Sequence, residues 1–104
     1  MRLEEGHLKE VYYGDFRVVV LEHIRRIEAA APEAYSTGWF LLRYLRRIAR
    51  LTAEPGAEHG VQSGMRSLLR FYVDQVEETS DLGDVCNQVF EAHRRSLRVQ
   101  EPRG

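Results

Sequence analysis

Residues 39–52 read WFLLRYLRRIARLT, and this stretch decides the fold class. At helical steps of about 100° per residue, its apolar side chains fall on an arc of roughly 200°, which is wide enough for more than one neighbouring helix to cover. The arc contains Phe40, Leu41, Leu42, Tyr44, Leu45, Ile48, Ala49 and Leu51. We therefore predict a central helix from about Trp39 to Thr52.

The segment before this helix also has helical spacing. Gly14 and Asp15 resemble a break and a cap, because an aspartate side chain can accept hydrogen bonds from the first free amides of a helix. A helix from about Phe16 to Ala30 follows, and Pro32 ends it. The polar residues at 36–38 supply a cap for the central helix. The apolar side of this earlier helix consists of Phe16, Val20, Ile24 and Ile27.

Two further helices are predicted after the central one. The proline, glycines and glutamates between residues 53 and 64 indicate a solvated loop. A helix resumes after Ser63 and ends near Thr79, and Ser80 with Asp81 caps a last helix that continues to about Arg98. The fourth main segment, residues 82–98, has its apolar residues at helical spacing. The stripe predicted for the helix before it is Met65, Leu68, Leu69, Tyr72 and Val76.

No stretch alternates for long enough to indicate a half-buried strand, so we predict an all-α fold. Its architecture is a compact bundle of four main helices with a short additional N-terminal helix, in a single domain spanning residues 1–104. The additional helix falls within residues 1–13, and residues 99–104 are expected to form a disordered tail. The apolar side predicted for the N-terminal helix is Leu3, His7, Leu8, Val11 and Tyr12, with Gly6 weakening the helix.

Composition narrows the class of protein. The formal net charge is -1, which excludes a uniformly basic protein. Cys86 is the only cysteine, so no internal disulfide can form. The opening residues are charged, and the longest apolar stretches, 18–21 and 39–42, are too short for a signal peptide or a membrane span. We therefore expect a cytoplasmic protein that does not act in a membrane.

The sequence offers no clear catalytic or metal-binding set. Glu4-x-x-His7 matches half of the ligand pattern of di-iron bundles, which need that pattern twice. Cys86 lies on the apolar side of the last helix, and His93 lies two turns further on, about 10 Å away by helical rise. No glycine-rich phosphate loop followed by lysine occurs. We expect no enzyme, no catalytic residue, no metal, no cofactor and no small-molecule substrate.

The polar side of the central helix is strongly basic. No acidic residue lies between Glu33 and Glu54, so four arginines form an uncompensated stripe about 100° wide. Such a stripe can follow phosphates while an indole stacks on a base, or it can pair with acidic groups on protein. We call this set the basic stripe: Trp39, Arg43, Arg46, Arg47 and Arg50.

An acidic cluster lies near the turn into the last helix. Two of its members, Asp81 and Asp84, favour the positive end of that helix dipole. If it lay on the surface opposite the basic stripe, two copies would fit head to tail and form rings or filaments. We call this set the acidic corner: Asp74, Glu77, Glu78, Asp81 and Asp84. Candidate aromatic anchors for a partner are Tyr13, Tyr35, Trp39 and Phe71.

Three functional hypotheses follow from these features. The leading one is a non-enzymatic helical protein-interaction module, either an adaptor that associates with itself through the two charged surfaces or a small subunit of a larger assembly. The alternative is a subunit that binds nucleic-acid backbone, for which the basic stripe should merge with Arg94, Arg95 and Arg98 into one surface. The third, a thiol or metal enzyme around Cys86, predicts fast alkylation of that thiol.

Overall fold

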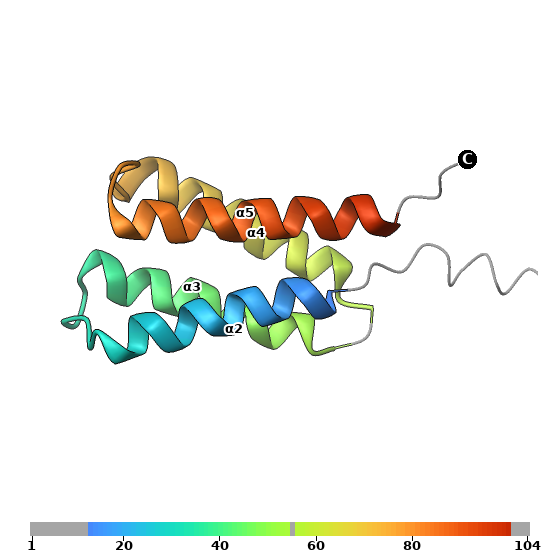
Figure 1. Cartoon of the computed structure of the whole chain (residues 1–104), viewed down its shortest axis with the longest axis horizontal. Coiled ribbons are helices and arrows are strands. Elements are labelled where there is room, and N and C mark those ends of the chain that lie inside the picture. The colour runs from blue at the N-terminus through green and yellow to red at the C-terminus, as the bar shows by residue number, and fades with distance from the viewer. Residues whose placement is uncertain (1–12, 55, 101–104) are drawn as a thin grey trace, which may run out of the picture.

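The computed structural model describes residues 13–54 and 56–100, and these residues form an up-down-up-down bundle (Figure 1). No strand occurs within the described residues, so the predicted all-α bundle of four main helices is confirmed. The predicted N-terminal helix lies outside them. The helices are α2 (Gly14–Ala29), α3 (Thr37–Thr52), α4 (Glu58–Gln75) and α5 (Asp81–Gln100).

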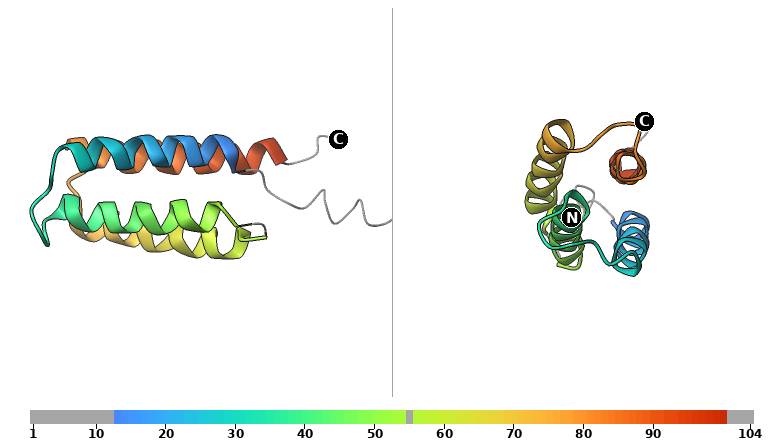
Figure 2. Two further views of the ribbon diagram at one scale, coloured as in Figure 1. Left: turned by 90° about the horizontal axis from the view of Figure 1, so that it is seen from below. Right: turned by 90° about the vertical axis from the view of Figure 1, so that its left-hand side faces the viewer.

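The helices form a four-membered ring when viewed along the bundle (Figure 2). Helix α3 packs against α2 and α4, and α5 packs against α2. The fourth side of the ring, between α4 and α5, is the least closely packed of the neighbouring pairs. Consequently α3 and α5 lie diagonally across the bundle, and their outer faces point in different directions.

The core confirms the central role predicted for α3. Five of its residues are buried: Leu41, Leu42, Leu45, Ile48 and Ala49. The predicted apolar positions of α2, namely Phe16, Val20, Ile24 and Ile27, are also buried. Phe40 differs from the prediction, because it is 38% exposed at the edge of the arc.

Helix α4 begins earlier than predicted, because residues 58–64 are helical and not loop. The reason is packing against α3. A Cβ atom on Gly60 would lie 3.2 Å from Cδ2 of Leu51, and one on Gly64 would lie 3.2 Å from Cγ1 of Ile48. The absent side chains allow the two helices to come close, and this contact outweighs the helix-propensity cost of about 1 kcal/mol for each glycine.

Several other boundaries and positions also differ from the sequence prediction. Helix α4 ends at Gln75 and not near Thr79, because Val76 adopts an extended conformation with φ -110° and ψ 133°. Asp15 lies within the first turn of α2 and is not its cap. Helix α5 continues to Gln100, two residues into the segment predicted as a tail.

Polar contacts tie the ends of helices to their neighbours. The guanidinium of Arg17 on α2 donates hydrogen bonds to the carbonyl oxygen of Ala49 and, at 3.1 Å, to Oγ1 of Thr52. A cation at this position complements the negative end of the α3 dipole.

None of the described helices is long and apolar enough to span a membrane.

Candidate functional site

The first turn of α3 displays an aromatic cluster on the surface. Oγ of Ser36 caps the helix by accepting a hydrogen bond from the amide of Trp39 at 3.3 Å, as the polar cluster at 36–38 predicted. Tyr35 is 74% exposed, and its ring centroid lies 4.7 Å from that of Trp39. Phe40 packs edge-on against Trp39 at 5.0 Å. Large exposed aromatic side chains are typical of interface anchors.

The loop that presents this cluster has an unusual backbone. Tyr35 has a φ of 68° and Ala31 has a φ of 47°, both in the left-handed region. A bulky residue pays roughly 1–3 kcal/mol to stay in such a conformation. Strained positions of this kind gather at binding sites, where the surrounding structure holds them in place. The sequence carried no signal for this strain, since neither residue is glycine or asparagine.

The residues of the basic stripe differ in the contacts that they make. The guanidinium of Arg43 lies over the ring of Trp39, 5.1 Å from its centroid. Arg46 forms an ion pair with Glu28 of α2 at 2.7 Å, so its charge is partly compensated. Arg47 and Arg50 form no ion pair with another described residue. All four arginines are exposed and border a hollow of about 520 Å³, together with Phe40 and Tyr44.

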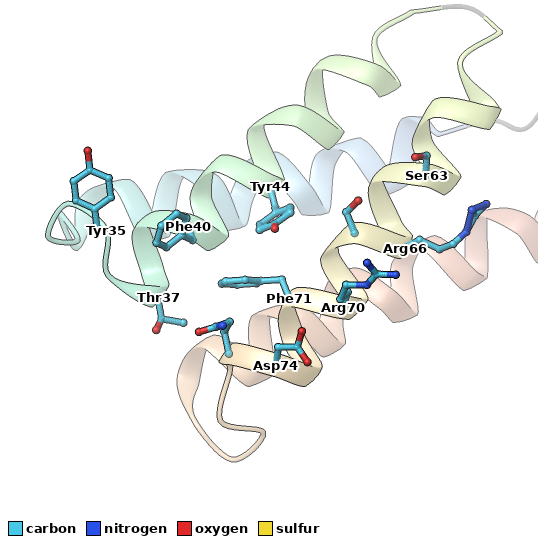
Figure 3. A pocket seen from close by; sticks show the side chains of 11 residues that line it. Tyr35, Thr37, Phe40, Tyr44, Ser63, Arg66, Arg70, Phe71 and Asp74 are labelled. Carbon is cyan, nitrogen blue, oxygen red and sulfur yellow. The ribbon is translucent and has the colours of Figure 1, made fainter.

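A second hollow of about 600 Å³ lies between α3 and α4, and we call it the α3–α4 hollow (Figure 3). It shares Phe40 and Tyr44 with the first hollow, so the two are continuous. Its α4 side adds Arg66 and Arg70, one helical turn apart. The whole surface therefore has an aromatic middle with arginines on both sides. The complete lining is Tyr35, Thr37, Phe40, Tyr44, Ser63, Arg66, Ser67, Arg70, Phe71, Asp74 and Gln75.

The α4 half of this surface was not predicted from the sequence. Arg66 and Arg70 have the i, i+4 spacing that places two side chains on one face of a helix, and this signal was present but not used. Phe71 was predicted as an exposed anchor, but it is buried, with its ring centroid 4.9 Å from that of Tyr44. Tyr13 is likewise buried, at 9% exposure. Of the predicted anchors, Tyr35 and Trp39 stay at the surface.

The acidic corner forms one end of the bundle, where α4 passes into α5. All five of its residues are exposed. Ser80 holds the turn, since its Oγ accepts from the amide of Gly83 at 3.1 Å and donates to the carbonyl of Glu77 at 2.6 Å. Gly83 is buried under this turn, and the carbonyl oxygens of Glu77 and Glu78 would lie 2.6 Å from a Cβ atom placed on it. The predicted cap of the last helix is therefore present.

One member of the acidic corner, Asp74, lies on the α3–α4 surface and not on a face opposite it. Asp74 of the acidic corner lines the same hollow as Arg66 and Arg70. The arginines of α3 lie further along the bundle, toward the end where α4 begins. Head-to-tail assembly would require the acidic corner to lie opposite the basic stripe, and Asp74 does not lie there.

The C-terminal arginines do not extend the basic stripe. Arg94 and Arg95 are exposed on α5, which lies diagonally across the bundle from α3. Arg94 also forms an ion pair with Glu91 on its own helix. Arg66 lines both the α3–α4 hollow and a further groove that contains Arg94, so among the described side chains the two arginine sets meet only through Arg66.

Buried ionisable groups lie in the core, away from this face. Burial lowers the pKa of His23, and the nearby charge of Arg26 lowers it further. Burial also lowers the pKa of His93, whose ring contacts the ring of Phe16 edge-on at a centroid distance of 5.4 Å. The pKa of Tyr13 is raised to about 12, first by burial and then by the charge of Glu58. These groups are therefore neutral near pH 7.

Cys86 provides a direct test of the thiol-enzyme hypothesis. Its side chain is fully buried, and burial raises the pKa of the thiol to about 11 from a usual value of 9.0. The thiolate is the reactive form, so we expect alkylation of the folded chain near pH 7 to be at least roughly 100-fold slower than alkylation of the unfolded chain. Iodoacetamide kinetics with and without denaturant measure this ratio. Equal rates would restore the enzyme hypothesis.

The function must be argued from the geometry of these surfaces. No group of three or more His, Cys, Asp or Glu side chains in residues 13–54 and 56–100 is placed to hold a metal ion. Comparisons with protein-family models, with curated proteins and with solved structures find no match to this chain.

Proposed function

We propose that this chain is a non-enzymatic protein-interaction module whose α3–α4 face binds an acidic protein surface. The observation that carries the proposal is the continuous surface formed by the two hollows, in which Phe40 and Tyr44 lie between arginines of α3 and α4. Aromatic and arginine side chains together are the residues most enriched at interface hot spots. The aromatic middle offers apolar contact area, and the arginines select a partner of negative charge.

A protein partner fits this surface better than a phosphate backbone does. Asp74 lines the α3–α4 hollow and would repel phosphates there, whereas a protein partner can place a basic or polar group opposite it. Arg94 and Arg95 lie on the diagonal helix, and only Arg66 borders both the α3–α4 hollow and the groove that contains Arg94. A short basic surface of this kind suits a folded partner or a helix better than an extended strand.

A second copy of the chain meets these requirements. The acidic corner lies at one end of the bundle, and the arginines of α3 extend toward the other end along the adjoining side. Two copies placed antiparallel, with their α3–α4 faces together, would bring each acidic corner to the basic stripe of the other copy. This contact is isologous, so it closes as a two-fold dimer and does not continue as a filament.

Light scattering behind size-exclusion chromatography tests the proposal, at roughly 0.05 M and 0.5 M salt, where exposed charges are weakly and strongly screened. At low salt we expect a mass near twice 12.1 kDa, and at high salt a mass near 12.1 kDa. The variant Arg43→Glu with Arg47→Glu should remain a monomer at both salts, because it turns two attractions into repulsions. Trp39 is the only tryptophan and lies under the Arg43 guanidinium beside the two hollows, so its fluorescence reports association locally.

The matched control is Arg94→Glu with Arg95→Glu, which makes the same change of charge on the diagonal helix. We expect this variant to associate as the unmodified chain does, and circular dichroism should show that both variants stay folded. A monomer at both salts for the unmodified chain would contradict self-association. Nucleic acid that co-elutes with the chain and is lost only in the α3 variant would favour the phosphate-binding alternative.

A further inference from the structure

A separate groove follows the seam between α4 and α5, the least closely packed side of the ring. It has a volume of about 510 Å³. Leu69 was predicted to face the core, but it is 48% exposed on the wall of this groove. The other apolar side chains of the lining are Met65, Phe90 and Leu97. Contiguous apolar surface of this kind marks a site where another segment or molecule binds.

The described part of the chain begins beside this groove. The first described residue, Tyr13, stacks on His93 of α5, with ring centroids 6.3 Å apart and an interplanar angle of 13°. His93 is itself part of the groove lining. Tyr13, to which residues 1–12 are joined, therefore contacts a residue of the groove lining.

Two buried polar atoms at this place have no hydrogen-bond partner among the described residues. They are the hydroxyl oxygen of Tyr13 and Nε2 of His93. Leaving a buried polar group unpaired costs free energy, and such groups usually mark a missing partner.

The sequence of residues 1–12 suits the groove. Leu3, Leu8 and Val11 recur at spacings that place them on one side of a helix. As a helix, twelve residues would extend about 18 Å. Each groove wall spans seven residue steps of its helix, or roughly 10 Å, so the segment is long enough to follow the whole groove. Glu4 falls on the same side of such a helix.

The edges of the groove carry positive charge, opposite in sign to that of Glu4. Arg66 on α4 and Arg94 on α5 both belong to the lining. Arg66 forms no ion pair with a described residue, and Arg94 is paired only with Glu91 of its own helix. The acidic side chain of Glu4 is therefore matched in sign to both edges.

We propose that residues 1–12 bind in the α4–α5 groove of the same chain, with Leu3, Leu8 and Val11 against its apolar walls. Covalent attachment at Tyr13 keeps the segment at a high effective concentration, so weak contacts are sufficient for binding. The segment would cover Leu69 and leave the α3–α4 hollow open. This inference does not rest on the proposed function, because the groove shares only Arg66 with the α3–α4 hollow.

A spin label on the full-length chain tests the proposal. Lys9→Cys places a nitroxide on the side of the predicted helix away from the apolar residues, and the fully buried Cys86 stays unlabelled in the folded chain. We expect strong loss of the amide signals of Met65, Leu69 and Leu97, and little loss at Arg43 on α3. Weak loss spread evenly over the bundle, or loss centred on α3, would overturn the proposal.

Two further measurements separate this proposal from its competitors. In the labelled chain, Leu69→Asp should restore the groove signals, whereas Val73→Asp should not, because Val73 is 70% exposed on the same helix but outside the groove lining. At roughly 0.5 M salt, where the chain is expected to be a monomer, a sample that mixes labelled chain with isotope-labelled, spin-free chain should show no loss of the groove signals. Loss in the mixed sample would mean that a second copy occupies the groove, and the proposal would be wrong.

Discussion

Phe16→Ala is expected to lower the free energy of unfolding by about 3–5 kcal/mol, the usual range for removing a buried phenyl ring. Phe16 is fully buried on α2. Its ring packs edge-on against His93 of α5 at 5.4 Å and lies 5.8 Å from the ring of Tyr13. The substitution therefore leaves a cavity at the contact that joins α2 to α5, and also removes the aromatic support of the Tyr13 and His93 pair.

Denaturant unfolding followed by circular dichroism measures this loss. The melting temperature should fall by about 4–8 °C for each kcal/mol in a domain of this size. Val18→Ala is the matched control, since Val18 lies on the same helix but is 58% exposed. It should change the stability by less than about 0.5 kcal/mol. A similar loss for both variants would contradict the placement of Phe16 in the core.

Gly83→Ala is expected to lower the free energy of unfolding by about 1–3 kcal/mol, the cost of forcing an extra group into a well-packed site. The added Cβ would lie 2.6 Å from the carbonyl oxygens of Glu77 and Glu78, which belong to the backbone and cannot rotate away. The turn would have to move, and the hydrogen bond from the Gly83 amide to Ser80 would weaken. The cost should exceed the gain of up to about 1 kcal/mol that alanine brings to a helix.

Gly60→Ala provides a control at the equivalent third position of α4. Its added Cβ would meet the flexible side chain of Leu51, whose nearest atom, Cδ2, would lie at 3.2 Å. We expect the stability of this variant to stay within about 1 kcal/mol of that of the unmodified chain, because the helix-propensity gain of alanine offsets the small shift required of the Leu51 side chain. Thermal unfolding of both variants gives the comparison. Greater destabilisation by Gly60→Ala would show that the turn before α5 is not the tighter of the two sites.

The sequence by itself determined the elements that depend on local pattern. The wide apolar arc of residues 39–52 predicted the central helix, and five of its residues are buried as expected. Ser36 and Ser80 were recognised as caps because their hydroxyls can satisfy free amides at a helix start, and both do so. Periodicity and capping depend on residues only three or four positions apart, so a short segment of sequence is enough to predict them.

The residue types of the candidate site were predictable from the sequence, but the way in which α3 and α4 bring them together was not. It identified the arginines of α3, yet the α4 contribution of Arg66 and Arg70 depends on how the two helices pack. That packing lets Phe40 and Tyr44 lie between the two arginine sets. Phe71, predicted at the surface, is buried by the same contact with Tyr44. Which edge of an apolar arc stays exposed is set by the neighbouring helix, not by the arc.

The tertiary structure alone decided the start of α4 and the relation between the charged surfaces. Gly60 and Gly64 weaken a helix in isolation, but they allow α3 and α4 to come close, and burial against Leu51 and Ile48 stabilises the helix. Asp74 follows Arg70 by one turn of α4, but its place in one hollow with Phe40 and Tyr44 depends on the packing of α4 against α3. These features arise from contacts between residues far apart in the chain, which local propensity and periodicity cannot describe.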